Sequence, residues 1–255
     1  MLYQKPCATQ PELIYRREVS QLIEDVYVKY WLHDSNLPLV VIFSNARYPT
    51  RILDLSNPGY HPWGYRFIRK HGVNVLAFSC FESVNWYRSL IFHQYLRELA
   101  PVLQQKFPAR IGYGSSLGGY ATSAFADLLG LRRLLLLNPI STLNPDCVPW
   151  ETRYAEARRN YIWDHSFQDG ATTTSEGYIV YDPDFAPDAQ HAKRYNKKFI
   201  HLCLPGVEHG MPVHLKKLGI LKPLVTDFIF DTLDLQAIGY ALKNRLPYAG
   251  KYVSD

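Results

Sequence analysis

The chain has 255 residues, of which 47% are hydrophobic and 20% charged. A chain of this length and composition can bury a large core, which excludes a disordered or fibrous protein. The net charge is only +5 and no dense Lys/Arg block occurs, so we expect no nucleic-acid partner.

The cysteines and the apolar runs indicate the cellular compartment of the protein. Four cysteines are spread widely along the chain and are expected to be reduced: Cys7, Cys80, Cys147 and Cys203. The first ten residues contain no apolar signal core, and no run reaches the roughly 18 apolar residues needed to cross a bilayer. We therefore expect a cytoplasmic protein without a membrane span.

Seven segments are predicted to form strands. Residues 25–31 alternate polar and apolar side chains and are predicted to form a half-exposed antiparallel edge. Six later segments are short, largely apolar and bounded by Gly, Pro, Asn or Asp, as is typical of buried parallel strands. They are residues 39–43, 73–78, 111–113, 134–137, 178–181 and 199–204.

Segments with helical spacing alternate with these strands. They are residues 63–71, 86–106, 117–129, 188–195 and 224–242. Gly72 and Gly130 follow two of them, where a left-handed residue commonly ends a helix. The alternation predicts one α/β domain over residues 1–255, with a mostly parallel, doubly wound sheet and helices on both faces. The last helix is expected to cover the sheet, and a dimer face is the alternative.

Residues 138–176 interrupt this alternation. The segment has no predicted strand but many aromatic residues, including Trp150 and Trp163. It is interpreted as a cap over a pocket, because long insertions in compact domains are often functional. A helical excursion that packs on the sheet edge is the alternative. If the segment is a cap, Trp150 and Trp163 are expected to bind substrate.

A GxSxG sequence, Gly114-Ser115-Ser116-Leu117-Gly118, joins a predicted strand to a predicted helix. A serine at such a sharp turn adopts a strained backbone and presents its hydroxyl clear of the sheet. The helix that begins there directs its positive end toward any oxyanion beside the serine. A phosphate-binding turn is the alternative, but the glycines fit neither GxGxxG nor a P-loop. The pattern favours Ser116 as a nucleophile.

This turn resembles the nucleophile elbow of the α/β-hydrolase superfamily, and the order of elements from about Val26 to Leu246 is similar too. The resemblance implies a nucleophile, an acid and a histidine in that order, each on a loop after a strand. His209 follows the last predicted strand on a loop bracketed by Gly206 and Gly210, and is the expected base. A histidine that only caps the next helix is the alternative.

Three aspartates follow the strand at 178–181 and could supply the acid: Asp182, Asp184 and Asp188. Asp188 is expected to cap the next helix, since Pro-Asp before a helical run is a common start signal. The resemblance implies an acid a few residues past the strand end, which favours Asp184. Asp182 stays the alternative.

The resemblance also implies an oxyanion hole with two N–H donors. One would come from Leu117, after the nucleophile, and the other from Asn45 or a neighbour after the strand at 39–43. The His-Gly dipeptide that many relatives have at the second position is missing here. Ser44, which begins this loop, is expected to bind substrate.

Together these residues predict a serine hydrolase that cleaves a carboxylic ester or thioester through a Ser-His-Asp triad and an acyl-enzyme. The expected partner is a small-molecule acyl substrate, with no cofactor. No metal is expected, because the histidines and cysteines form no ligand cluster. An acyltransferase that uses the same triad, and a hydrolase-like protein that binds without turnover, are the alternatives.

Overall fold

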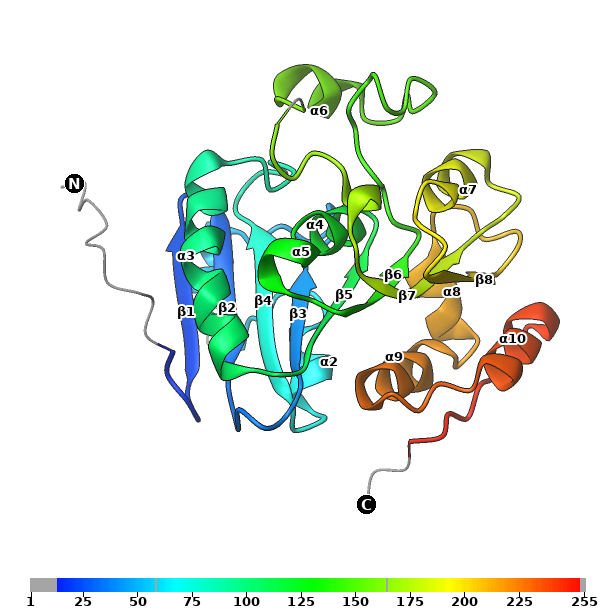
Figure 1. The fold of residues 1–255 in the computed structure, drawn as a ribbon, viewed down its shortest axis with the longest axis horizontal. Helices are drawn as coiled ribbons and strands as arrows, with labels where there is room; N and C mark the ends of the chain where they lie inside the picture. The colour runs from blue at the N-terminus through cyan, green and yellow to red at the C-terminus, as the bar shows by residue number, and fades with distance from the viewer. Residues whose placement is uncertain (1–12, 58, 164, 253–255) are drawn as a thin grey trace.

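A single twisted sheet lies at the centre of the molecule (Figure 1). The structure is a computed structural model that describes residues 13–57, 59–163 and 165–252. Within these ranges the sheet has eight strands in the order β1-β2-β4-β3-β5-β6-β7-β8. They are β1 (Glu18–Ile23), β2 (Val26–Trp31), β3 (Leu39–Phe43), β4 (Asn74–Cys80), β5 (Arg110–Ser115), β6 (Arg133–Leu137), β7 (Glu176–Tyr181) and β8 (Phe199–Cys203). β2 runs antiparallel to both of its neighbours, and all pairings from β4 to β8 are parallel.

Helices cover both faces of this sheet. One apolar core contains residues of α3 (Leu90–Lys106), α4 (Leu117–Ala124), α5 (Ala126–Leu129) and α7 (Ala186–Lys193). The other contains residues of α2 (Tyr65–Arg69), α8 (Met211–Lys217), α9 (Leu221–Phe230) and α10 (Leu235–Asn244). Side chains along a strand alternate between faces, so Val41 of β3 faces the first core and Ile42 the second. The doubly wound α/β architecture predicted from the sequence is confirmed.

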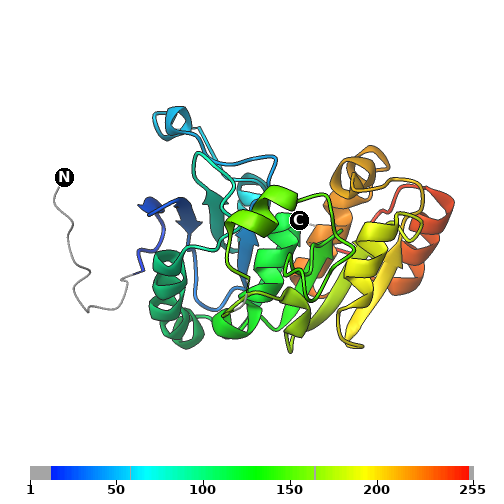
Figure 2. The same cartoon turned by 90° about the horizontal axis from the view of Figure 1, so that it is seen from above.

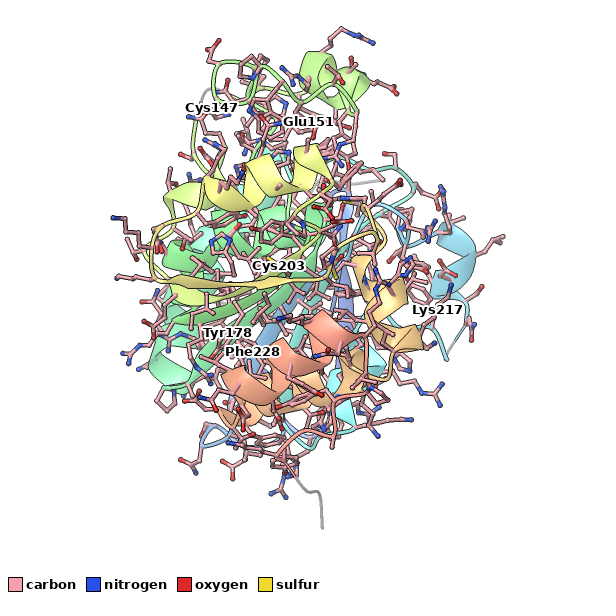
Figure 3. The ribbon with its side chains drawn as sticks, turned by 90° about the vertical axis from the view of Figure 1, so that its right-hand side faces the viewer. Cys147, Glu151, Tyr178, Cys203, Lys217 and Phe228 are labelled. Carbon is pink, nitrogen blue, oxygen red and sulfur yellow. The ribbon has the colours of Figure 1, made fainter. Side chains whose placement is uncertain are left out.

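In the second core the C-terminal helices α8, α9 and α10 pack on the sheet, including β7 and β8. Tyr178 of β7 and Phe228 of α9 meet edge to face, with ring centroids 6.3 Å apart (Figure 3). Such contacts make α9 a cover for the sheet, as expected of the C-terminal helical segment.

The first strands differ from the prediction. The segment at 25–31 is β2, but it is buried and internal, because β1 pairs on its outer side. β1 is partly exposed and carries mixed polar and apolar residues, so it has neither the apolar run nor the strict alternation that marks a strand.

Two predicted helices are each broken in two. The segment at 117–129 divides at Phe125 into α4 and α5. The segment at 224–242 falls into α9 and α10, because Asp231 takes a left-handed conformation (φ 59°) and ends α9. Gly72 and Gly130 have the predicted positive φ, at 70° and 65°.

The described part of the predicted insertion contains two short helices, α6 (Ala155–Asn160) and η1 (Gly170–Thr172), and no strand before β7 begins at its last residue, Glu176. α6 lies above the carboxyl ends of the strands in Figure 1. Figure 2 views the molecule from that end, and α6 there lies in front of the sheet. A further short helix, α1 (Ile52–Leu55), projects from the connection between β3 and α2. The insertion's role as a cap stays a prediction.

Cys80, Cys147 and Cys203 are free thiols, as expected. Cys7 and the N-terminal residues considered as a possible signal lie outside the described residues. None of the helices in the described ranges is both long and apolar enough to cross a membrane.

Candidate active site

Ser116 stands at the turn between β5 and α4 in a strained conformation, with φ 55° and ψ −121°. Close packing permits no side chain on the two glycines around it. A Cβ on Gly118 would lie 2.1 Å from the carbonyl oxygen of Phe43, and one on Gly114 would lie 2.4 Å from that of Gly118. The turn at Ser116 therefore packs directly against the end of β3, and this close approach requires the two glycines.

This packing predicts that Gly118→Ala destabilises the fold by about 2 kcal/mol, since the clash is with backbone that cannot rotate away. Urea unfolding of the variant and the wild type measures the effect. Gly239→Ala is the matched control, because Gly239 lies within α10 and a Cβ at this position would meet nothing within 4 Å apart from its chain neighbours and the backbone of its own helix. We expect the control to be as stable as the wild type or slightly more stable. Equal stability of Gly118→Ala and the wild type would contradict the packing argument.

Three side chains form a continuous hydrogen-bonded chain at the carboxyl end of the sheet. The Ser116 hydroxyl lies 2.8 Å from Nε2 of His209. Nδ1 of the same ring lies 2.7 Å from one carboxylate oxygen of Asp188 and 2.9 Å from the other. His209 comes from the loop between β8 and α8, and Asp188 from the first turn of α7. The order serine, imidazole, carboxylate is that of a nucleophilic triad.

The structure corrects the predicted acid. Asp188 does not cap a helix, because α7 begins at Ala186 with Phe185 as its N-cap, and its buried carboxylate faces His209 instead. Asp184, the predicted acid, is exposed, and its backbone N–H donates to Asp182.

Asp182, the alternative, supports the histidine loop rather than the histidine ring. Its carboxylate accepts the backbone N–H groups of Val207 and Glu208, each at 2.7 Å. Burial opposes the charged form, but these backbone hydrogen bonds outweigh it and hold the pKa of Asp182 below its usual value. Asp182 thus fixes the loop that carries His209.

Asn138 was not predicted as a site residue. It directly follows β6, is buried, and has a positive φ of 38°. Its amide donates to the backbone carbonyl of His209 at 3.2 Å and accepts from the Ser115 hydroxyl at 3.3 Å. The sequence signal that could have identified Asn138 is its place as a polar residue directly after an apolar strand. Asn138 ties the histidine loop to the elbow.

Two residues of the insertion also reach the triad, and neither was predicted as a site residue. Arg153 donates to the Asp188 carboxylate at 2.9 Å. The hydroxyl of Tyr154 lies 3.4 Å from Nε2 of His209. The insertion therefore contributes both a cation and a phenol to the centre formed by the core domain.

Behind Arg153 lies Glu151, the buried centre of a charged cluster next to α7 (Figure 3). Its carboxylate pairs with Arg153 at 2.6 Å and accepts from Nε2 of His191 at 3.0 Å. Burial favours the neutral acid, but the hydrogen bonds from His191 and Arg153 outweigh it and lower the pKa of Glu151 to about 2. Burial favours the neutral form of His191 too and lowers its pKa, although the hydrogen bond and charge of Glu151 oppose this shift. Glu151 is thus a carboxylate and His191 a neutral imidazole at neutral pH.

The two predicted oxyanion donors lie near Ser116, Leu117 next to it in the chain and Asn45 in the wall of the same cavity. Leu117 is the first residue of α4, so its N–H has no acceptor within the helix. Asn45 lines the cavity that contains Ser116, and its side chain accepts from the N–H of Arg47. The N–H of Ser44 is already used, because it donates to Phe78 at 2.8 Å. Leu117 and Asn45 as the donors stay a prediction.

Ser116 and His209 open onto a cavity of about 760 Å³. Its walls include the 45–48 loop, Trp63, Tyr154 and the start of α8. The predicted substrate contacts Ser44, Trp150 and Trp163 are not among its lining residues, so the structure does not bring them to this cavity. Ser44 and Trp163 are buried in the fold. Trp150 packs on His191, with ring centroids 4.6 Å apart.

Within the described part of the chain, no cluster of three or more His, Cys, Asp or Glu side chains could hold a metal ion. The hydrogen-bonded order of a serine hydroxyl, an imidazole and a carboxylate is the arrangement that nucleophilic acyl transfer requires.

Solved structures with a similar fold exist at low sequence identity. The capsule O-acetyltransferase of Neisseria meningitidis serogroup A has a TM-score of 0.54 and 12% identity, and the match covers 83% of this chain and 94% of that one. A sugar hydrolase from Lactococcus lactis has a TM-score of 0.53 and 13% identity, covering 90% and 100%. Est1E from Butyrivibrio proteoclasticus has a TM-score of 0.52 and 13% identity, covering 84% and 98%. No protein-family model and no curated protein matches the chain. These similarities show the fold: the chain has the α/β-hydrolase fold.

Proposed function

We propose that this protein is a serine hydrolase that cleaves a carboxylic ester through an acyl-enzyme. The observation that carries the proposal is the hydrogen-bonded chain from Ser116 through His209 to Asp188, at the wall of an open cavity. A serine hydroxyl is a weak nucleophile unless a base takes its proton, and the imidazole 2.8 Å away is placed to do so.

In the proposed reaction, Ser116 attacks the acyl carbon while Nε2 of His209 takes its proton. The tetrahedral oxyanion is stabilised by the N–H of Leu117 and by the positive end of α4. Asp188 fixes the ring through Nδ1 and stabilises the imidazolium that forms. His209 then protonates the leaving group, and water releases the acid from the acyl-enzyme in the reverse sequence of proton transfers.

Acyl transfer to a hydroxyl acceptor is the second candidate. The same residues would act, with an alcohol in place of water at the acyl-enzyme. The similarity in fold to an O-acetyltransferase favours keeping this candidate. Product analysis with a short acyl ester and an added sugar or polyol distinguishes the two, because a transferase forms the new ester in preference to the free acid.

The first test is intact mass after incubation with a fluorophosphonate, which phosphonylates activated serines. We expect the wild type to gain one label, and Ser116→Ala and His209→Ala to gain none under the same conditions. Ser115→Ala is the matched control and should still be labelled, because Ser115 contacts Asn138 and not His209. A wild type that stays unlabelled while a control serine esterase reacts would overturn the proposed function.

A further inference from the structure

Tyr154 lies against the reacting atoms but has no part in the mechanism so far. It precedes α6 in the insertion and lines the same cavity as Ser116 and His209. Its hydroxyl is 3.4 Å from Nε2 of His209, and the same nitrogen lies 2.8 Å from the Ser116 hydroxyl. The phenol therefore sits beside the line along which the proton moves between serine and histidine.

The position of this ring is well fixed. Trp86 packs edge to face on it, with ring centroids 5.0 Å apart. The guanidinium of Arg153 lies 5.4 Å from the ring centroid, and the same guanidinium is bound to Asp188. Because Trp86 and the Asp188-bound Arg153 both pack on the Tyr154 ring, the hydroxyl stays in place during the reaction without rearrangement.

The position of Tyr154 relative to Ser116 and His209 determines which substrate oxygen can accept a hydrogen bond from its hydroxyl. The oxyanion forms beside the N–H of Leu117 at the start of α4. The leaving-group oxygen must instead approach Nε2 of His209, because that nitrogen delivers its proton. A hydroxyl next to Nε2 therefore faces the leaving group. Burial raises the pKa of Tyr154 even though the Arg153 charge opposes it, so the phenol keeps its proton and can donate.

We propose that Tyr154 donates a hydrogen bond to the leaving-group oxygen, and that the substrates are esters of weakly acidic alcohols such as aliphatic or sugar hydroxyls. The inference rests on the proposed function. A weakly acidic alcohol carries much negative charge as its bond to the acyl carbon breaks, so a donor there stabilises the transition state strongly. A phenolate or thiolate leaves readily without such help.

In the step concerned, the bond between the acyl carbon and the alcohol oxygen breaks, and its electron pair goes to that oxygen. The proton on Nε2 of His209, taken earlier from Ser116, passes to the same oxygen and yields the neutral alcohol. Tyr154 donates a hydrogen bond throughout and keeps its own proton. The acyl group stays on Ser116 until water removes it.

The test is the leaving-group dependence of Tyr154→Phe. We measure kcat/KM of the wild type and the variant for p-nitrophenyl, phenyl, trifluoroethyl and ethyl esters of one acid. We expect the variant to lose about 10- to 100-fold on the ethyl ester, as a hydrogen bond to a charged group implies, and less than about 2-fold on the p-nitrophenyl ester. Tyr48→Phe is the matched control, because Tyr48 lines the same cavity but is half exposed to solvent, and it should leave the dependence unchanged.

The outcomes separate this inference from the proposed function. A wild type that hydrolyses the esters, with a Tyr154→Phe variant that loses equal activity on all of them or none on any, overturns the role of Tyr154 alone. A wild type that hydrolyses none of them and takes no fluorophosphonate label overturns the proposed function, and this inference with it. Labelling of Tyr154→Phe at one site shows that its elbow and base are intact.

Discussion

Asp188→Asn is expected to lower kcat/KM for an ester substrate by about 10³- to 10⁴-fold while the protein stays folded. The carboxylate lies 2.7 Å from Nδ1 of His209 and is fully buried, so its charge acts on the ring with little screening by water. An asparagine has nearly the same shape but cannot stabilise the imidazolium, and it allows the ring to take the wrong tautomer. Steady-state kinetics of the purified variant measure the loss, and circular dichroism checks the fold.

Asp184→Asn is the control for this prediction. Asp184 lies on the same loop after β7 but is exposed, so its kcat/KM should stay within about 2-fold of the wild type, as for surface substitutions away from a site. Full activity in Asp188→Asn, or a large loss in Asp184→Asn, would show that the hydrogen bond to His209 does not identify the working acid.

The features that the sequence predicted well are encoded locally. The apolar runs mark β3 to β8, since a strand buried on both faces needs almost continuous apolar residues. The sharp turn at Ser116 could be located because the glycines that it requires are neighbours in the sequence. The loop of His209 could be located because a Gly-bracketed histidine follows the last apolar run.

The choice among the aspartates failed for a geometrical reason. All three follow β7 within seven residues, so spacing along the chain scarcely separates them. Pro187 and Asp188 suggested a helix start, but α7 begins at Ala186, two residues before Asp188. Such a shift turns a side chain by more than half a helical turn, and helix boundaries are not predictable to that accuracy.

The contribution of the insertion could not be predicted, because it depends on contacts between distant parts of the chain. Arg153 meets Asp188, which is 35 residues away, and Tyr154 meets His209, which is 55 residues away. No local pattern specifies such pairs. The large aromatic residues Trp150 and Trp163 were predicted to bind substrate instead, but side chains of that size commonly fill a core. Here Trp163 packs on Trp86 and Trp150 packs on His191 of α7.

The cluster behind the triad leads to the second large expected effect, which concerns stability. Glu151→Gln is expected to lower the free energy of unfolding at pH 7 by about 3 kcal/mol. Glu151 is only 1% exposed and pairs with Arg153, so the variant leaves part of a partly buried cation uncompensated. The amide is close in shape to the carboxylate and can still accept from His191, which isolates the effect of the charge.

The pH dependence identifies the carboxylate as the source. The pKa of Glu151 is about 2 in the folded protein, against an ordinary value of 4.5. Because the folded-state pKa is lowered, the unfolded chain binds the proton first, and stability falls as the pH drops below about 4.5 toward 2. His191, whose pKa is also lowered from an ordinary 6.5, adds a loss of the same sign that begins below that value. Only the first of these losses disappears in Glu151→Gln.

Urea unfolding at several pH values between 7 and 3 measures both effects. Over this range the wild type should lose about 2 kcal/mol more than Glu151→Gln, so that the two stability curves converge in acid. Glu156→Gln is the matched control, since Glu156 lies on the exposed side of α6, and its curve should follow that of the wild type. Parallel curves for Glu151→Gln and the wild type would mean that the buried charge of Glu151 does not hold the insertion against α7.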